Sequence, residues 1–365
     1  MIDTERIYRL DPAAAGTLTE QLTENLRRAI ANGVYKSGDR LPGIREMAKL
    51  CATSVQVPID AMKTLTDEGF VKARPRIGCI VLEQNRKVWR GRILIVHVGA
   101  YTNYSQNVFC AETARLLEAA NWRVEHAFVP RLGLEEYDLS SIRKEIAERF
   151  DLVLLPAYDP PIVRLVLERG LPYMLLSAQV GEFKEPGCIG MTAQASSQAF
   201  VDFAEHCREA CIRRMLCVTA DVCDLKAFEV LKRTDVEVEE LVISNDGSDK
   251  TAERFACWAY EALMRCLGDG RKPRPDLVFF SDDYLARGGF LALERLGLHA
   301  PEDIKVVSLV NTGNVPFYPI PLTRFEHNPF DEAKVMVQMI LRYFKTGRTP
   351  RTVLCDIRYV RGETF

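Results

Sequence analysis

The stretch that decides the fold is Gly38-Asp39-Arg40-Leu41-Pro42-Gly43-Ile44-Arg45-Glu46-Met47-Ala48. Its Pro-Gly pair separates a preceding helical pattern, which ends near Asn32, from a new one. Ile44, Met47 and Ala48 then form a single apolar stripe at helical spacing. This arrangement predicts a short helix that docks on the helices to either side of it.

A second helix is expected after a brief turn at residues 51–54, with Ser54 as its N-cap. Its buried face carries Val57, Ala61, Met62 and Leu65. Its outer face carries Val55, Gln56, Ile59, Asp60 and Lys63. Pro58 falls in the first turn, where a proline costs little because an N–H at that point has no helical partner. We interpret this helix as the candidate reader of a DNA major groove.

The chain after this helix has the pattern of a small β-hairpin. Glu68-Gly69-Phe70-Val71 ends the helix, and residues 70–73 and 79–82 are predicted to be two strands. Between them, Arg74, Pro75 and Arg76 make a basic tip. Two helices joined by a turn and followed by a hairpin predict a winged helix-turn-helix, with the hairpin as the wing.

Residues 12–82 resemble the DNA-binding domain of the GntR family of bacterial transcription regulators. The resemblance rests on Gly33-Val34-Tyr35, the opening stretch, residues 61–65 and the segment that enters the wing. It implies a DNA-binding surface made of Arg45, Ser54, Gln56, Lys63, Arg74, Arg76 and Gly78. For Arg45, an ion pair within the module is the alternative to a DNA contact. The chain departs from the family at Val55, where an Arg commonly follows the Ser, and at Arg76, where the wing usually has a glycine.

Length and charge predict a second, larger unit behind this module. The chain has 365 residues, of which 47% are hydrophobic, and this is enough for a sizeable body. Residues 1–92 hold 16 Lys and Arg against 11 Asp and Glu, a balance of +5, which leaves −7 for the rest. A basic head on an acidic body fits a protein that presents one end to phosphate.

Composition also excludes several classes of protein. Without a long apolar run or a signal pattern, the chain is expected to be cytoplasmic. The eleven cysteines form no CxxC pair, which favours reduced thiols and predicts no metal site. No GxGxxG follows residues 93–98, and GxxxxGK[ST], HExxH and GxSxG are all missing. An enzyme built on open α/β sheets is therefore disfavoured, and no cofactor is expected.

From residue 92 onward, short β-branched runs alternate with amphipathic stretches, which is typical of βαβ units and parallel sheets. Two such sheets would form two lobes with a ligand cleft at the carboxyl ends of their strands. We expect a head at 1–82, a linker at 83–91 and a body at 92–365. The expected lobe one comprises 92–211 and 323–346, and the expected lobe two comprises 212–322 and 347–365.

The body resembles the effector-binding domain of LacI/GalR regulators and related periplasmic sugar-binding proteins. The resemblance is carried by the segment Pro275-Asp276-Leu277-Val278-Phe279-Phe280-Ser281-Asp282-Asp283, the run from Gly297 to Leu309, Pro321-Leu322-Thr323 and the closing Arg361-Gly362. A GntR-type head on a LacI-type body is the architecture of arabinose regulators of the AraR kind. The expected fold is thus an α/β two-lobed body behind a winged helix-turn-helix.

This resemblance places effector contacts on loops that follow sheet strands. The candidate residues are Tyr101, Asn103, Tyr104, Tyr158, Asp159, Gln179, Asp221, Lys226, Asp282 and Asn311. Sugars suit such a set, because aromatic rings cover C–H faces while carboxylates and amides satisfy hydroxyls. For most of these residues a purely structural role is an alternative to effector binding. Asp282 fits either an effector contact or the N-cap of the following helix, whereas Asp283 is expected to be the N-cap. Lys226 fits a solvated helix face as well as a sugar contact.

The two resemblances together imply a DNA-binding transcription regulator. We expect a repressor of carbohydrate-utilisation genes that binds operator DNA as a homodimer and responds to a small-molecule effector, a sugar by this reasoning. The alternative is a sugar-binding sensor whose head no longer binds DNA, which Val55 and Pro58 suggest.

Overall fold

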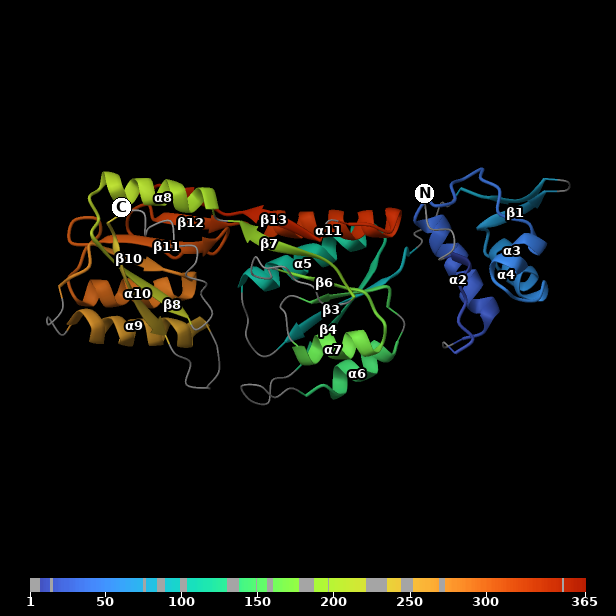
Figure 1. The fold of residues 1–365 in the computed structure, drawn as a ribbon, viewed down its shortest axis with the longest axis horizontal. Coiled ribbons are helices and arrows are strands. Elements are labelled where there is room, and N and C mark those ends of the chain that lie inside the picture. The colour runs from blue at the N-terminus through green and yellow to red at the C-terminus, as the bar shows by residue number, and fades with distance from the viewer. Residues whose placement is uncertain are drawn as a thin grey trace.

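The computed structural model describes residues 7–13, 16–74, 77–83, 89–98, 104–129, 138–148, 150–155, 160–176, 187–195, 197–220, 235–243, 252–268, 273–349 and 351–365. Three bodies follow one another along the long axis, which we call the head, lobe one and lobe two (Figure 1). None of the helices in these described ranges is long and apolar enough to cross a membrane.

The head is the predicted winged helix-turn-helix. It contains α2 (Leu18–Ala31), α3 (Ile44–Leu50), α4 (Gln56–Asp67), β1 (Val71–Arg74) and β2 (Gly78–Val81). Helix α2 begins with a capping box, in which the Thr17 hydroxyl accepts from the Glu20 N–H and the Glu20 carboxylate accepts from the Thr17 N–H. Its buried Leu22 and Leu26 pack with the apolar faces of the other two helices and with the hairpin. The order of elements therefore follows the helical and strand periods of the sequence.

The start of α4 differs from the prediction in one detail. The helix begins at Gln56 with Val55 in the N-cap position, and no side chain caps it, so Ser54 is not the N-cap. Pro58 is the third helical residue and is buried. A proline there interrupts no helical hydrogen bond, because the first N–H groups of a helix have no internal acceptor.

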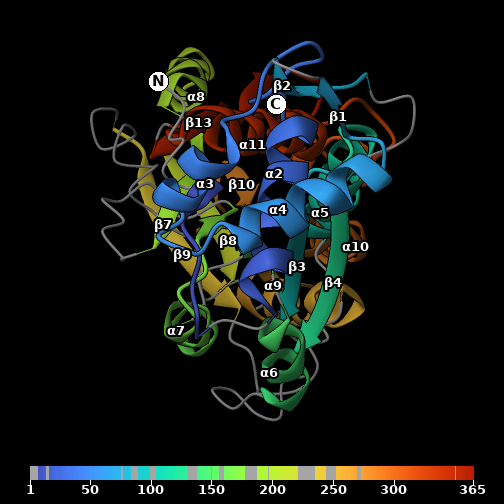
Figure 2. The same ribbon diagram turned by 90° about the vertical axis from the view of Figure 1, so that its right-hand side faces the viewer.

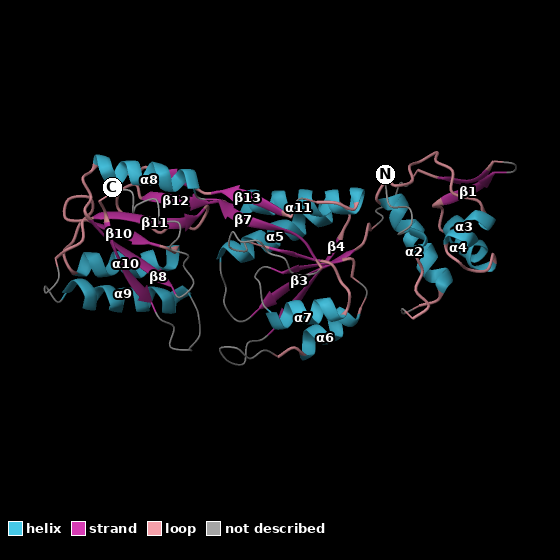
Figure 3. Ribbon diagram, viewed as in Figure 1, coloured by secondary structure: helices cyan, strands magenta, loops and turns pink. Residues whose placement is uncertain are grey.

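Lobe one is built on a fully parallel sheet with strand order β13-β7-β6-β5-β3-β4. Its strands are β3 (Arg92–Val98), β4 (Arg123–Val129), β5 (Leu152–Leu155), β6 (Tyr173–Leu175), β7 (Cys188–Ala195) and β13 (Thr352–Asp356). Its helices are α5 (Tyr104–Ala119), α6 (Ser140–Ala147), α7 (Pro160–Glu168) and α11 (Pro329–Thr346). Helices cover both faces of the sheet, α5 and α11 on one and α6 and α7 on the other (Figure 3).

Lobe two repeats the design with strand order β14-β12-β11-β10-β8-β9. Its strands are β8 (Arg214–Ala220), β9 (Glu237–Ile243), β10 (Leu277–Phe280), β11 (Lys305–Asn311), β12 (Thr323–His327) and β14 (Arg358–Val360), of which β14 alone is antiparallel to its neighbour. Helices α9 (Ala252–Gly268) and α10 (Asp283–Arg295) cover one face, and α8 (Ser197–Glu209) covers the other.

The chain crosses between the lobes at positions other than those predicted. The three crossings run from β7 to α8, from β12 to α11 and from β13 to β14, each through a single residue. Helix α8 belongs to lobe two because its Phe200 and Phe203 pack on Phe279 and Phe325. Residues 197–211 and 323–327 therefore lie in lobe two, and residues 352–356 lie in lobe one. The predicted division differs because the lobe of each segment depends on which strands pair, and the sequence pattern does not show strand pairing.

The head rests on the near end of lobe one. Arg28 of α2 forms an ion pair with Asp151, whose other oxygen accepts from the Arg92 N–H at 2.9 Å. The Asn32 side chain donates to the Arg90 carbonyl at 3.3 Å. These contacts connect α2 to the segments that lead into β3 and β5. A movement of lobe one can therefore be transmitted to the head through them.

Candidate DNA-binding surface and effector cleft

The face of the head farthest from the lobes is formed by α3 and α4. In Figure 1 these helices lie beyond α2 as seen from lobe one, and in Figure 2 they face the viewer at the end of the molecule. Arg27 of α2 holds the end of α4 through Glu68, with N–O distances of 2.8 and 2.9 Å. The helix that is expected to read DNA is therefore fixed to α2 and directed away from the body.

The exposed side of α4 matches the predicted outer face. Val55, Gln56, Ile59 and Lys63 are exposed, whereas Ala61, Met62 and Leu65 are buried in the head core. The Gln56 Nε2 donates to Asp60 Oδ1 at 2.9 Å, which orients the amide along the helix. Both sides of this helix could be predicted, because the 3.6-residue period can be read from the sequence without knowing what the helix packs against.

Cations surround this surface. Arg45 on α3 is exposed and forms no ion pair with any described residue, so the structure gives no support to the alternative of an ion pair within the module. Arg74 is exposed at the end of β1, and Arg76 lies outside the described residues. Sequence reasoning missed Lys49, which is exposed on the same short helix as Arg45.

Gly78 has a backbone reason to be glycine. Its φ is +106°, and a Cβ there would lie 3.1 Å from Arg40 Nε. Arg40 thus packs along the base of the wing, next to the bridge that it makes with Ile80. Arg40 is not among the residues predicted for the DNA-binding surface, although it belongs to the stretch of residues 38–48 that identifies the head.

The predicted effector loops follow the carboxyl ends of the strands. Strands β3, β5, β6, β8 and β10 end within a few residues before the predicted Tyr101, Tyr158, Gln179, Asp221 and Asp282 respectively. The predicted Asn311 is the last residue of β11. Tyr101, Asn103, Tyr158, Asp159, Gln179, Asp221 and Lys226 lie outside the described residues, as does the side chain of Tyr104. Asp282 and Asn311 are the two predicted effector residues whose side chains the structure describes.

The helix cap is Asp282, for which a cap was one of the two expected roles, and the expectation that Asp283 is the cap is wrong. Asp282 is the N-cap of α10, and its Oδ1 accepts from the Tyr284 N–H at 2.8 Å. Asp283 is fully buried, and its Oδ2 accepts from Asn311 at 3.1 Å and from Asn314 at 2.9 Å. Asn311 uses both ends of its amide inside the protein, because its Oδ1 lies 3.1 Å from the Nδ1 of His327.

Burial raises the pKa of Asp282 to about 6, and the adjacent Asp283 adds to the effect. Since the folded pKa exceeds the unfolded value of 3.8, stability is lost as pH rises from about 4 to about 6. Asp282→Asn keeps a good N-cap but removes the charge. We expect this variant to be more stable than the wild type by about 1–2 kcal/mol at pH 7 and equal to it near pH 4, by urea unfolding. If the difference in the free energy of unfolding between Asp282→Asn and the wild type did not change with pH, the raised pKa of Asp282 would be contradicted.

A buried polar network extends from this helix end to a crossing between the lobes. His327 ends β12, and its Nε2 lies 2.9 Å from Oε2 of Glu332 in the first turn of α11. Both side chains are 1% exposed, and His327 also meets Asn311 through its Nδ1, so these hydrogen bonds are made inside the protein. Neither residue was singled out from the sequence, because the pair becomes visible only when β12 and α11 are placed together.

Replacing His327 with Leu is expected to leave the Glu332 Oε2 and Asn311 Oδ1 atoms without the partner that His327 supplies, while Asn311 keeps its hydrogen bond to Asp283. The free energy of unfolding should fall by about 2–4 kcal/mol, measured by urea denaturation. Lys334→Ala, which removes an exposed pair with Asp331 on the same helix, should change it by less than about 0.5 kcal/mol. Equal losses in both variants would show that the network does not stabilise the crossing.

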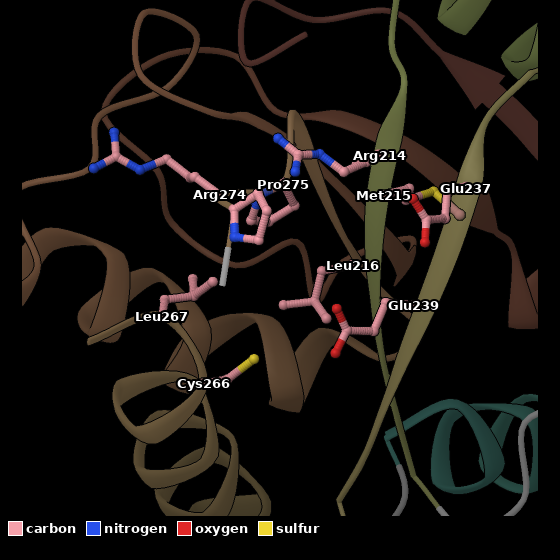
Figure 4. Close-up of a pocket in the computed structure, with 10 residues that line it drawn as sticks. Arg214, Met215, Leu216, Glu237, Glu239, Cys266, Leu267, Arg274 and Pro275 are labelled. Carbon is pink, nitrogen blue, oxygen red and sulfur yellow. The ribbon is translucent and has the colours of Figure 1, made fainter. Parts of the chain in front are cut away.

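A separate cavity of about 340 Å³ lies in lobe two (Figure 4). Its lining includes Arg214 and Glu237, which begin β8 and β9, and Cys266 and Leu267 near the end of α9. It therefore opens at the amino ends of the strands, whereas ligands of open parallel sheets bind beyond the carboxyl ends. We do not identify this cavity with the effector cleft.

Comparison with known families agrees with this architecture. Residues 18–81 match the family described as bacterial regulatory proteins of the gntR family, and residues 204–365 match the periplasmic binding protein-like domain. The chain thus joins a gntR-family DNA-binding domain to a periplasmic-binding-protein-like body.

Curated relatives match over limited regions. An uncharacterised HTH-type transcriptional regulator of Escherichia coli, YdcR, is 35% identical over 77 residues, which is 21% of this chain and 16% of that protein. The HTH-type transcriptional repressor PurR of Pectobacterium carotovorum is 32% identical over 103 residues, 28% of this chain and 27% of PurR. The chain therefore spans only about a sixth to a quarter of the length of these two relatives.

Solved structures confirm the fold of the body. A LacI family transcriptional regulator from Bifidobacterium animalis has a TM-score of 0.58 at 17% identity, covering 75% of this chain and 97% of that one. A LacI family regulator from Arthrobacter in complex with lactose has a TM-score of 0.57 at 17% identity, covering 75% and 99%. At this identity the likeness shows the fold and leaves the ligand open.

Proposed function

We propose that this protein is an effector-responsive, DNA-binding transcription regulator, a repressor of carbohydrate-utilisation genes that acts as a homodimer on a pseudo-palindromic operator. The observation that carries the proposal is the exposed face of α4, directed away from the body on a gntR-family head and bordered by cations that form no ion pair with any described residue. The repressor assignment is supported by the relatives named PurR repressors.

On DNA, each part of the head has a distinct role in this proposal. Arg45 binds phosphate or a guanine edge, Gln56 and Lys63 enter the major groove, and Arg74 and Arg76 anchor the wing. Phosphate contacts supply affinity and fix the register, whereas the groove contacts supply sequence preference.

The effector of the proposal is a small polar molecule, a sugar by the chemistry of the predicted cleft. Asp282 follows the carboxyl end of β10, and the stretches that come after β3, β5, β6 and β8 in the sequence carry Tyr, Asn, Gln and Asp. Closure of the cleft would rotate the lobes about the three crossings and move the head through Arg28 and Asp151. To change operator occupancy from nearly full to nearly empty, the effector must distinguish the two states by about 5 kcal/mol.

A mobility-shift assay with the intergenic DNA upstream of the gene tests the regulator itself. A sequence-specific, salt-sensitive complex is expected well below micromolar protein. If none forms near micromolar protein, the sensor with a non-binding head becomes the better description. A sugar panel then tests the cleft: one sugar should raise the melting temperature and release DNA, and Asp282→Ala should abolish that release. No thermal shift, with release unchanged in the variant, would reject the cleft assignment.

A further inference from the structure

An apolar pair stands at the centre of the face that is proposed to read DNA. Val55 and Ile59 are one turn apart at the start of α4, and their side chains are 48% and 42% exposed. They are not members of the buried head core, to which this helix contributes Ala61, Met62 and Leu65. Their exposure leaves apolar surface on this face of the head.

The charges around the pair limit what that partner can be. Arg45, Lys49 and Lys63 are exposed on the same two helices and form no ion pair with any of the residues described. A cationic border around an apolar centre complements a polyanion that carries apolar groups in its groove. Duplex DNA has one such group on the edge of its major groove, the C5-methyl of thymine.

Gln56 adds a polar group to the same turn of α4. Its Nε2 donates one hydrogen to Asp60 at 2.9 Å, which leaves Oε1 and the second N–H for another partner. Adenine offers a matching acceptor and donor in N7 and the N6 amino group, and it pairs with thymine. The amide and the two apolar side chains therefore suit neighbouring A·T pairs.

We infer that Val55 and Ile59 read thymine methyl groups, with Gln56 on an adjacent adenine, so that the operator half-site of this protein contains A·T pairs under the start of α4. This inference rests on the proposed function and names the chemistry that the recognition helix selects. Loss of one buried methyl contact should weaken binding about fourfold.

The test uses the full chain and a duplex that it selects from a random library. Each thymine is replaced in turn by deoxyuridine, which removes only the methyl group, and binding is measured by fluorescence anisotropy. For the wild type, one or two positions per half-site should lose about fourfold. For Val55→Ala and Ile59→Ala, the uridine penalty at the matching position should fall below about 1.5-fold. Ile77→Ala, which shortens an exposed residue in the wing, is the matched control and should keep the full penalty.

Four outcomes would overturn the inference. Thymine readout would be rejected if binding by the wild type is insensitive to every uridine, or if Ile59→Ala keeps the full uridine penalty. In both cases the selection of a specific duplex would still support the role as a regulator. If a variant that combines Val55→Ala with Ile59→Ala changes the molar mass in solution and leaves the uridine response unchanged, the pair belongs to a protein interface. Failure to select any duplex would reject the inference and the proposed function together.

Discussion

Replacing Gly288 with alanine is expected to lower the free energy of unfolding by about 3 kcal/mol or more. Gly288 is buried in α10, and a Cβ there would lie 1.8 Å from the carbonyl oxygen of Ala256 in α9. A backbone atom inside a helix cannot move aside as a flexible side chain can, so the two helices must separate. The loss should be visible in urea unfolding followed by the fluorescence of Trp258, which lies on α9 beside this core.

Gly268→Ala is the matched control on α9. Its Cβ would meet Leu296 at 3.5 Å, an ordinary contact, and the helix would gain from the exchange of glycine for alanine. Its stability should stay the same or rise by up to about 1 kcal/mol. If Gly288→Ala were as stable as this control, the close crossing of α9 and α10 would be wrong.

The second large effect is expected on DNA. Changing Arg45, Lys49 and Lys63 together to alanine should weaken operator binding by about two orders of magnitude or more. Because each phosphate contact releases counterions, the slope of log affinity against log salt should become less steep by up to about three. Titrations of one operator duplex at several salt concentrations measure both quantities.

The control for this variant removes the same number of exposed cations from lobe two. Arg208 on α8, Arg213 just before β8 and Arg358 on β14 are exposed. Lobe two, which carries them, lies at the opposite end of the molecule from the head (Figure 1). Their replacement should change neither the slope nor the affinity by more than about twofold. An equal effect of the two triple variants would mean that net charge, and not the surface of α3 and α4, attracts DNA.

Much of the fold could be predicted because its elements have clear periods. Strand β10 begins and ends where the apolar run of Leu277–Phe280 does, and α11 follows its amphipathic pattern. The strands next to the lobe crossings were not predicted. Strand β14 has three residues and β13 alternates between exposed and half-buried positions, so both exist only through pairing with distant strands.

In the candidate sites, too, features set by local periodicity could be predicted, and features set by contacts between distant segments could not. The outer face of α4 could be predicted, since the helical period alone separates Gln56, Ile59 and Lys63 from the buried sector of Ala61, Met62 and Leu65. The roles of Asp282 and Asp283 could not, because either carboxylate fits a helix cap and the choice depends on Asn311 at the end of β11 and on Asn314 just after it. Sequence position does not show that His327 meets Glu332 inside the protein.

The central claim is that this head recognises a particular DNA sequence. A competition experiment at physiological salt tests it most directly: labelled operator duplex, bound by the full chain, is displaced by unlabelled operator or by a shuffled duplex of the same composition. The account predicts that the shuffled duplex must be at least about a thousandfold more concentrated to displace half of the probe. Equal displacement by the two duplexes would contradict it.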